Sequence, residues 1–277
     1  MMQNVLILTG AGQIGTAIAR RLGYGMKLVI GDKQPEHARA VAQALNAAGF
    51  DAVPAEVDLA CRTSIRQLIQ TAQTYGDITM LVNAAGVSPS QAPVEQILQV
   101  DLYGTAVLLE EVGKVIAHGG AGVTISSQSG HRMPALTPQE DEQLACTPPE
   151  ALLDLPLLRP DRIRDTLHAY QLAKRCNEKR VMAESVRWGA RGARLNSISP
   201  GIIVTQLALD EFRGVRGDFY KKMFAASPAG RPGTADEVAN VAELLMRPQG
   251  AFINGADFLV DGGATASYFY GPLRPEA

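Results

Sequence analysis

The fold class is indicated most clearly by residues Val5 to Gly15, which read V-L-I-L-T-G-A-G-Q-I-G. Four apolar residues that favour a strand are followed at once by a G-x-G-x-x-G pattern and then by a run with helical spacing. Such a turn lets backbone N–H groups at a helix N-terminus approach a pyrophosphate, so the context favours dinucleotide binding over a merely structural strand-to-helix turn. The residues expected to contact the cofactor here are Gly10, Gly12, Gln13, Ile14 and Gly15.

In the rest of the chain, short apolar runs alternate with longer segments of helical periodicity. The strand-like runs are Val5–Leu8, Lys27–Ile30, Ala52–Glu56, Ile78–Val82, Gly122–Ser126, Arg194–Ile198 and Asp257–Val260. The helical segments are Ala17–Leu22, Ala38–Ala48, Ile65–Tyr75, Val94–Ile116, Lys174–Arg187 and Ala235–Arg247. This alternation predicts an α/β fold, namely a Rossmann-type, doubly wound, mainly parallel seven-stranded sheet with helices on both faces. At 277 residues, we expect a single domain spanning 1–277.

Two segments interrupt the alternation. Residues 132–168 are rich in Pro, Leu and acids, and Thr137-Pro138 and Thr147-Pro148 are typical helix starts, so short helices on a surface insertion are expected. Residues 206–230 are expected to form an amphipathic helix that packs on the body or closes over a ligand. Its apolar residues are Phe212, Phe219, Tyr220, Met223 and Phe224.

Composition excludes several classes of partner. A net charge of -2 gives no basic face for nucleic acid or anionic lipid, and no run approaches the roughly 20 apolar residues of a membrane span. The N-terminal apolar run is too short for a secretion signal, which predicts a cytoplasmic protein. Cys61, Cys146 and Cys176 are far apart, so neither a disulfide framework nor a metal site is expected.

Asp32 ends the second strand, about twenty residues beyond the glycines, where a carboxylate can accept both ribose hydroxyls of a dinucleotide. The same charge would repel a 2′-phosphate, whereas the adjacent Lys33 would partly offset that repulsion. NAD is therefore favoured, NADP stays possible, and an ordinary surface aspartate is the alternative.

The landmarks along the chain together identify a family. The chain resembles the short-chain dehydrogenases/reductases over nearly its whole length. The matching motifs are Thr9-Gly10-x-Gly12-x-x-Gly15, Asp58-Leu59, Asn83-Ala84-Ala85-Gly86, Ser126-Ser127, Tyr170-x-x-x-Lys174, Asn196–Gly201 with Thr205, Gly230-Arg231-x-Gly233 and Val260–Gly263.

The resemblance implies three catalytic roles that the chemistry supports. Tyr170 would exchange a proton with the substrate oxygen, although a phenol ordinarily titrates near pH ~10 and must be shifted toward neutrality. Lys174, one helical turn on, would stabilise the phenolate, and in the family it also binds the nicotinamide ribose. Ser127 would donate a hydrogen bond to the developing oxyanion. An ordinary surface pair is the alternative for a lone Y-x-x-x-K.

The resemblance also implies further cofactor contacts. Asp58 and Leu59 would lie at the adenine, and Asn83, Ala84 and Gly86 on the adenosine ribose side. After the turn at Pro200 and Gly201, Ile203 and Thr205 would hold the carboxamide. Strand-end caps and turns are the structural alternatives, and for Asn83 a sheet-stabilising role stands beside ligand contact.

Ser127 and Tyr170 are 170 − 127 = 43 residues apart, where most members of the family have about a dozen. The interval resembles the insertion of bacterial 3α-hydroxysteroid dehydrogenase/carbonyl reductase. A long detour costs little when both ends are held in rigid elements, about 0.6 kcal/mol per doubling of length. Its apolar residues would form a pocket rim or a subunit contact.

Asp101 departs from the family, which usually has an asparagine there that holds a water beside the catalytic lysine. An ionised carboxylate donates no hydrogen bond, and its charge would hold Lys174 as an ammonium, which predicts a shifted pH optimum. The glycine turn is also one residue tighter than the family's common spacing.

Taken together, the sequence predicts an NAD(P)-dependent oxidoreductase that interconverts a secondary alcohol and a ketone without a metal. The substrate is expected to be medium-sized and largely apolar. The alternatives are a catalytically silent dinucleotide-binding regulatory or scaffold protein and a sugar-nucleotide epimerase. A homodimer or homotetramer is expected, with the aromatic tail Ala264–Ala277 docking on a second subunit or forming a pocket wall.

Overall fold

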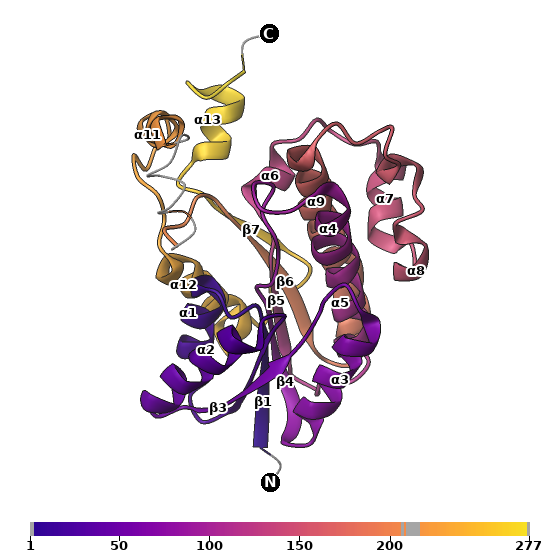
Figure 1. Ribbon diagram of the computed structural model, residues 1–277, viewed down its shortest axis with the longest axis vertical. Coiled ribbons are helices and arrows are strands. Elements are labelled where there is room, and N and C mark those ends of the chain that lie inside the picture. Colours follow the sequence, from indigo (N-terminus) through magenta and orange to yellow (C-terminus); the bar gives the residue numbers. More distant parts are fainter. Residues whose placement is uncertain (1–2, 206–207, 209–216, 276–277) are drawn as a thin grey trace.

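Seven parallel strands form one sheet in the order β3-β2-β1-β4-β5-β6-β7 (Figure 1). The structure is a computed structural model that describes residues 3–205, 208 and 217–275. The strands are β1 (Gln3–Thr9), β2 (Lys27–Asp32), β3 (Asp51–Glu56), β4 (Gly76–Asn83), β5 (Ala121–Ile125), β6 (Arg194–Pro200) and β7 (Asp257–Val260). The predicted fold class is confirmed. Strand order reverses between β1 and β4, which places the switch point, where such folds bind ligands, at the end of β1.

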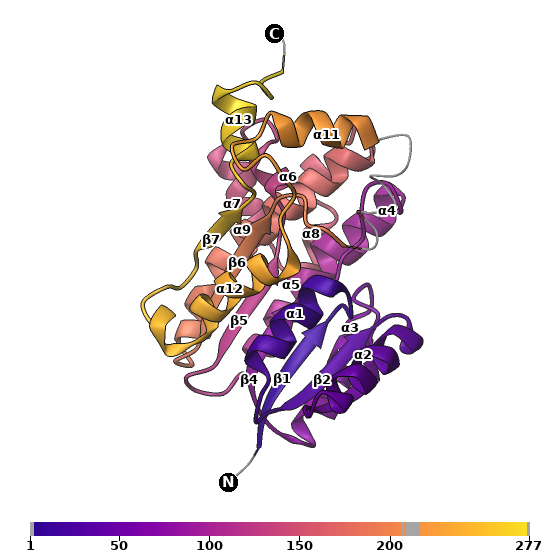
Figure 2. The same cartoon turned by 90° about the vertical axis from the view of Figure 1, so that its left-hand side faces the viewer.

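Alternate residues of β1 explain why helices cover both faces of the sheet. Leu6 and Leu8 pack with α1 (Gln13–Leu22), α2 (Pro35–Ala47) and α12 (Ala235–Met246). Val5 and Ile7 pack with helices on the opposite face (Figure 2), namely α3 (Arg62–Gln73), α5 (Thr105–Gly113) and α9 (Thr166–Gly189). Because both faces are buried, the strands read as continuous apolar runs.

The prediction of one continuous helical segment over Val94–Ile116 is wrong in detail. The segment instead contains α4 (Val94–Ile97), a π-helix η1 (Leu98–Gly104) and α5. The wider π turn carries Asp101, whose side chain is completely buried, and π turns of this kind are frequent at functional sites. The predicted start of α9 at Lys174 is also late, because Asp165 caps the helix by accepting the His168 N–H at 2.7 Å.

The 132–168 segment, which follows α6 (Gln128–His131), contains α7 (Pro138–Cys146), α8 (Pro149–Leu152) and a 3₁₀ turn η2 (Pro156–Leu158). Thr137 begins α7 with a complete capping box. Thr147 does not begin α8, contrary to the prediction, because Pro148 occupies the N-cap. Instead the Thr147 carbonyl accepts a hydrogen bond from Arg180 Nη2 at 2.6 Å, which ties the segment to α9.

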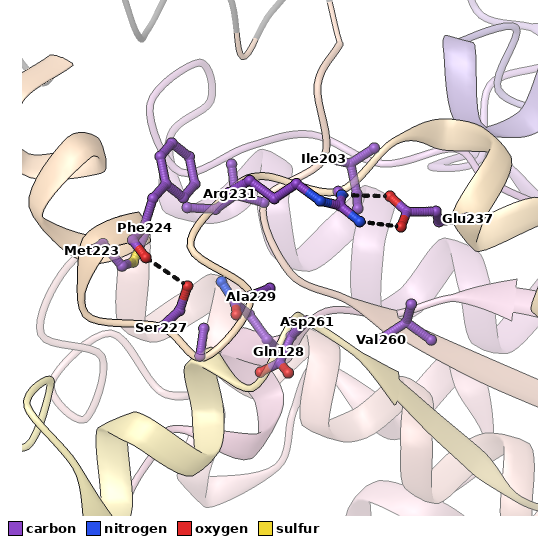
Figure 3. Close-up of a pocket in the computed structure, with 14 residues that line it drawn as sticks. Gln128, Ile203, Met223, Phe224, Ser227, Ala229, Arg231, Glu237, Val260 and Asp261 are labelled. Carbon is purple, nitrogen blue, oxygen red and sulfur yellow. Dashed lines mark hydrogen bonds and ion pairs between the residues drawn. The ribbon is translucent and has the colours of Figure 1, made fainter.

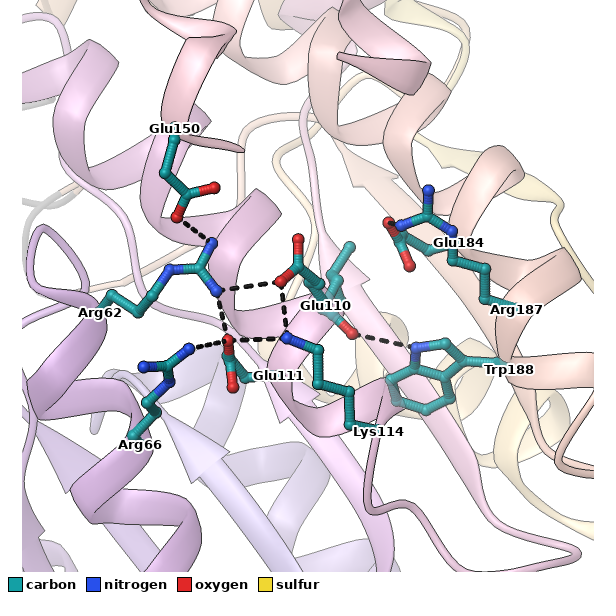
Figure 4. A network of polar contacts seen from close by, with 10 residues as sticks. Arg62, Arg66, Glu110, Glu111, Lys114, Glu150, Glu184, Arg187 and Trp188 are labelled. Carbon is teal, nitrogen blue, oxygen red and sulfur yellow. Dashed lines mark hydrogen bonds and ion pairs between the residues drawn. The ribbon is translucent and has the colours of Figure 1, made fainter. Parts of the chain in front are cut away.

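Apolar packing and ion pairs together fix the 132–168 segment on the body. Its buried leucines, which share one cluster with α9 and η1, are Leu144, Leu152, Leu155, Leu157 and Leu158. A polar network joins α8 to α3 and α5, because Arg62 Nη2 contacts Glu150 at 2.6 Å while Nη1 contacts Glu110 at 3.0 Å (Figure 4). Glu111 also contacts Arg62, and the surrounding basic groups overcome burial and lower the pKa of Glu111 to about 2.

The C-terminal part of the chain adds α11 (Gly217–Ala225) and α13 (Ala264–Tyr270). Tyr220, Met223 and Phe224 lie on α11, whereas Phe212 and the side chain of Phe219 lie outside the described residues. In α13, Ser267 Oγ donates to the Ala226 carbonyl at 2.6 Å, which joins the tail to the end of α11. Among the described residues, no helix has both the length and the apolar character needed to cross a membrane.

We predict that Leu144→Ala, which empties a fully buried position in α7, lowers the free energy of unfolding by about 2–5 kcal/mol. Leu167→Ala, at a side chain that is 50% exposed, is the control and should change it by about 0.5 kcal/mol or less. Urea unfolding measures both. Equal effects of the two variants would mean that the 132–168 segment is not packed as described.

Candidate active site

The glycine turn leaves room for a diphosphate. Gly10 has φ +86°, and a Cβ there would lie 2.5 Å from the Ala85 nitrogen, so any other residue would be strained. Gly12 is the N-cap of α1 and offers no side chain to cap the first-turn amides, while the space beside it is open within 4 Å. An anion at this helix N-terminus would meet backbone donors, so the turn fits the expected dinucleotide.

Asp32 lies beside this turn. Its Oδ2 accepts the Ala11 N–H at 2.8 Å, which leaves the carboxylate next to the glycine loop. Lys33 points elsewhere, because its Nζ contacts Asp58 Oδ2 at 2.9 Å. The sequence had assigned Asp58 to the adenine and Lys33 to offsetting the Asp32 charge. In the structure these two side chains pair with each other.

Asn83 holds the sheet at the switch point. Its side chain is 1% exposed, accepts from Thr9 Oγ1 at 2.8 Å and donates to Thr105 Oγ1 at 3.3 Å. Leu59 is also buried and packs against Gly104, where a Cβ would meet its carbonyl at 2.5 Å. Any cofactor contact of Asn83 would therefore use its backbone and the following Ala84–Gly86 turn.

The Pro200–Gly201 turn places Ile203 and Thr205, which were expected to hold the nicotinamide carboxamide, at the edge of the sheet where the strands end. The Gly201 N–H donates to the Val260 carbonyl at 2.9 Å. Ile203 then forms a bridge with Gly233, and Thr205 Oγ1 accepts the Ala208 N–H at 3.2 Å. These residues follow β6 directly, next to the residues that follow β5.

The end of β5 is joined to α9 by two hydrogen bonds. Ser126 Oγ donates to the Lys174 carbonyl at 2.9 Å, and Lys174 Nζ donates to the Ile125 carbonyl at 3.3 Å. Ser127 begins α6 as its N-cap, and its Oγ accepts the Ser129 N–H at 3.1 Å. That bond uses an acceptor position of Ser127, so its hydroxyl hydrogen is still available for donation.

Asp101 and Lys174 form a buried ion pair. Asp101 Oδ2 lies 3.4 Å from Lys174 Nζ, and the two side chains are 0% and 5% exposed. Asp101 Oδ1 accepts the Val87 N–H at 2.8 Å. Burial raises the pKa of Asp101, and Lys174 and the Val87 N–H only partly oppose this. Burial alone would lower the pKa of Lys174, but the Asp101 carboxylate and Tyr170 raise it.

Tyr170 lies one turn before Lys174 on α9, as the sequence predicted. Lys174 Nζ is 5.2 Å from the centre of the Tyr170 ring, within the range of a cation–π contact. The ring is half-buried and packs against the cluster that includes the leucines of the 132–168 segment. That segment therefore supports the tyrosine that it separates from Ser127 along the chain.

A cleft opens near the ends of β6 and β7. It lies between α11, the loop after β6 and the end of β7, and Figure 3 shows Met223 and Phe224 at one side and Ile203 at another. Gln128, the residue after Ser127, also lines it, whereas Ser127 and Tyr170 are not among the described lining residues. The charged pair on its wall is satisfied internally, since Arg231 binds both oxygens of Glu237, at 2.9 and 2.7 Å.

Sequence reasoning missed Gln128 and Glu237 as lining residues. Gln128 could have been suspected from its place directly after Ser127, because residues beyond a strand end share that edge of the sheet. Glu237 lies in the first turn of α12, where it reads as an ordinary capping-box residue with Thr234. Nothing in its spacing indicates that it also holds Arg231 at the cleft.

Comparison with known proteins gives consistent matches. A family model described as short chain dehydrogenase matches residues 3–138, and one described as enoyl-(acyl carrier protein) reductase matches 152–265. The chain is 39% identical to a short-chain dehydrogenase/reductase of Alternaria brassicicola, covering 96% of this chain and 97% of the relative. It is 31% identical to the D-threitol dehydrogenase of Mycolicibacterium smegmatis, covering 95% and 93%. A solved 7α-hydroxysteroid dehydrogenase complexed with NADH and 7-oxo glycochenodeoxycholic acid has a TM-score of 0.75 at 20% identity, covering 94% and 93%, which shows a shared fold.

Proposed function

Because this chain belongs to the short-chain dehydrogenase/reductase family and is an NAD(P)-dependent oxidoreductase acting on CH–OH groups, we propose that it interconverts a secondary alcohol and a ketone. The observation that carries the proposal is the junction of β5 and α9. Hydrogen bonds there fix Lys174 beside Ile125, one helical turn from Tyr170 and next to the strand end that bears Ser127.

In the proposed reaction, the nicotinamide, when bound, supplies or takes up a hydride at the substrate carbon. During reduction Tyr170 gives its phenolic proton to the substrate oxygen, and during oxidation it takes that proton back. Ser127 donates a hydrogen bond to the same oxygen and stabilises its developing negative charge. The ammonium of Lys174 favours the phenolate that remains on Tyr170. A silent scaffold would have no use for this set of groups.

Asp101 is proposed to act through Lys174. Its buried carboxylate holds the lysine as an ammonium and partly cancels the positive field that Tyr170 experiences. Gly86 leaves room for this arrangement, since a Cβ there would lie 3.2 Å from Asp101 Oδ2. Asp101 is therefore a positioning residue that sets the pH range of the reaction.

NAD is proposed as the preferred cofactor. The Asp32 carboxylate beside the glycine turn would repel a 2′-phosphate, and Lys33 is held by Asp58 instead of facing that position. The glycine turn, the Ala84–Gly86 turn and Ile203 with Thr205 would contact the two ends of the dinucleotide.

The substrate is proposed to be medium-sized and largely apolar, because Ile203, Met223, Phe224 and Val260 line the cleft and apolar side chains dominate the lining of small-molecule sites. We also propose a cytoplasmic homodimer or homotetramer. Free Cys61, Cys146 and Cys176 support a reducing compartment. Exposed Tyr270 supports a contact through the tail. Light scattering that gave only the 29.5 kDa monomer mass would contradict the assembly.

We predict that Tyr170→Phe lowers kcat for reduction of an apolar cyclic ketone by NADH about 100-fold or more. NADH affinity, followed by fluorescence titration, should change little, because only the proton donor is removed. Tyr24→Phe, at an exposed side chain just beyond the C-terminal end of α1, is the matched control. Turnover by the Tyr170 variant at the wild-type rate would eliminate this tyrosine as the proton donor.

We predict that Asp32→Ser raises the ratio of kcat/KM for NADPH to that for NADH roughly tenfold or more, since one charge repulsion of about 1.4 kcal/mol is removed. The substitution also removes the hydrogen bond from the Ala11 N–H to Asp32 and could loosen the glycine turn. Such loosening would weaken the binding of both cofactors and leave the ratio unchanged. Asp77→Ser, at an exposed aspartate, should leave the ratio unchanged. A wild-type enzyme that already prefers NADPH would refute the assignment.

A further inference from the structure

Three titratable side chains, from α6, α9 and β7, lie close together near the β5–α9 junction. His131 ends α6, Glu178 lies on α9 one turn after Lys174, and Asp257 begins β7. His131 Nε2 is 2.8 Å from Asp257 Oδ2 and 3.5 Å from Glu178 Oε1. One ligand atom from each residue lies within 4.8 Å of the other two. No local sequence pattern indicates this cluster, because its members are far apart along the chain.

Glu178 is the unusual member of this cluster. The residue is 7% exposed, and in the part of the chain that the structure describes its Oε1 has no hydrogen-bond partner. This is the same oxygen that faces His131. Arg175 does not satisfy it, because its Nη1 is 3.6 Å from the other oxygen, Oε2, while Nε and Nη2 bind Asp141 at 2.9 and 2.6 Å. A buried carboxyl oxygen without a hydrogen-bond partner is costly.

The backbone and the neighbouring strand favour this arrangement. Gly130 leaves the space that Glu178 Oε1 occupies, since a Cβ there would lie 2.3 Å away. Asp257 is held through its other oxygen, because Ser197 Oγ and Ser199 Oγ donate to Oδ1 at 2.6 and 2.9 Å. Supporting hydrogen bonds to one oxygen, with the second directed at the cluster, are typical of a carboxylate that binds a metal.

We propose that His131 Nε2, Glu178 Oε1 and Asp257 Oδ2 bind a divalent transition-metal ion, with Zn²⁺ as the best match. Ligands about 2.1 Å from a tetrahedral Zn²⁺ lie about 3.4 Å apart. The His131–Glu178 pair, at 3.5 Å, already meets this value, and the His131–Asp257 pair, at 2.8 Å, needs to open by about 0.6 Å. The Glu178 and Asp257 oxygens lie within 4.8 Å of each other and would have to approach to the same value. The His131 and Asp257 side chains are 27% and 15% exposed, so water can enter and complete the fourth position.

The ion would have a structural role. It would join the edge strand β7 to α6, which begins after Ser127, and to α9, which contains Lys174. It would contact neither Ser127 nor Lys174. Two carboxylates and a neutral imidazole would give the ion a nearly neutral first shell in a half-buried place. Mixed nitrogen and oxygen ligands favour Zn²⁺ over Mg²⁺ or Ca²⁺, which prefer oxygen alone.

The test is a Zn²⁺ titration of untagged, chelator-stripped protein, followed by isothermal calorimetry, with thermal unfolding as a second readout. Wild type should bind one Zn²⁺ per chain with micromolar or tighter affinity, and its Tm should rise with Zn²⁺. H131Q and E178Q should each weaken binding at least about tenfold and lose the Tm increase.

H37Q, at an exposed histidine outside the cluster, is the matched control and should bind as wild type does. Two variants are used so that a folding defect in one does not decide the outcome, and circular dichroism checks each. Absence of Zn²⁺ binding by wild type would overturn the proposal. Equal Zn²⁺ affinities of H131Q and H37Q would also overturn it, because the cluster histidine would then contribute no more than the control histidine. None of these readouts uses enzyme activity, so the result is independent of the proposed reaction.

Discussion

The site depends on one buried contact, the ion pair between Asp101 on η1 and Lys174 on α9. A charge with neither water nor a partner is costly to bury, so each of these side chains constrains where the other can lie. Lys174 in turn reaches the Ile125 carbonyl at the end of β5. The π turn, the helix and the strand are therefore fixed relative to one another at the place where Ser127 leaves the sheet.

This constraint explains how the chain tolerates the long interval between Ser127 and Tyr170. Both residues are held by rigid elements, the first by the end of β5 and the second by α9, so the path between them is free to vary. The 132–168 segment uses that freedom to cover α9 with leucines and to bind α3 through Arg62 and Glu150. As a consequence, the Tyr170 ring packs against the cluster that contains these leucines.

The sequence predicted the features that depend on local pattern. The strands follow from apolar runs, the tight turn between β1 and α1 from Gly10, Gly12 and Gly15, and the start of α7 from Thr137. It did not predict features that depend on partners far along the chain. The π turn that carries Asp101 has no signal in the local pattern, and its Asp101 side chain accepts the distant Val87 N–H. The pairing of Lys33 with Asp58 removes a charge that the sequence had placed near the cofactor.

The electrostatic link from Asp101 through Lys174 to Tyr170 can be measured by the pH dependence of kcat/KM for alcohol oxidation by wild type and Asp101→Asn. Asparagine keeps the side-chain shape but removes the negative charge, so the positive field of Lys174 acts on Tyr170 uncompensated and favours its phenolate. In the variant, the rising limb of the profile should move to lower pH by at least about half a unit, with turnover retained. Superimposable profiles would contradict it, because Asp101 would then have no electrostatic link to the proton-transfer group.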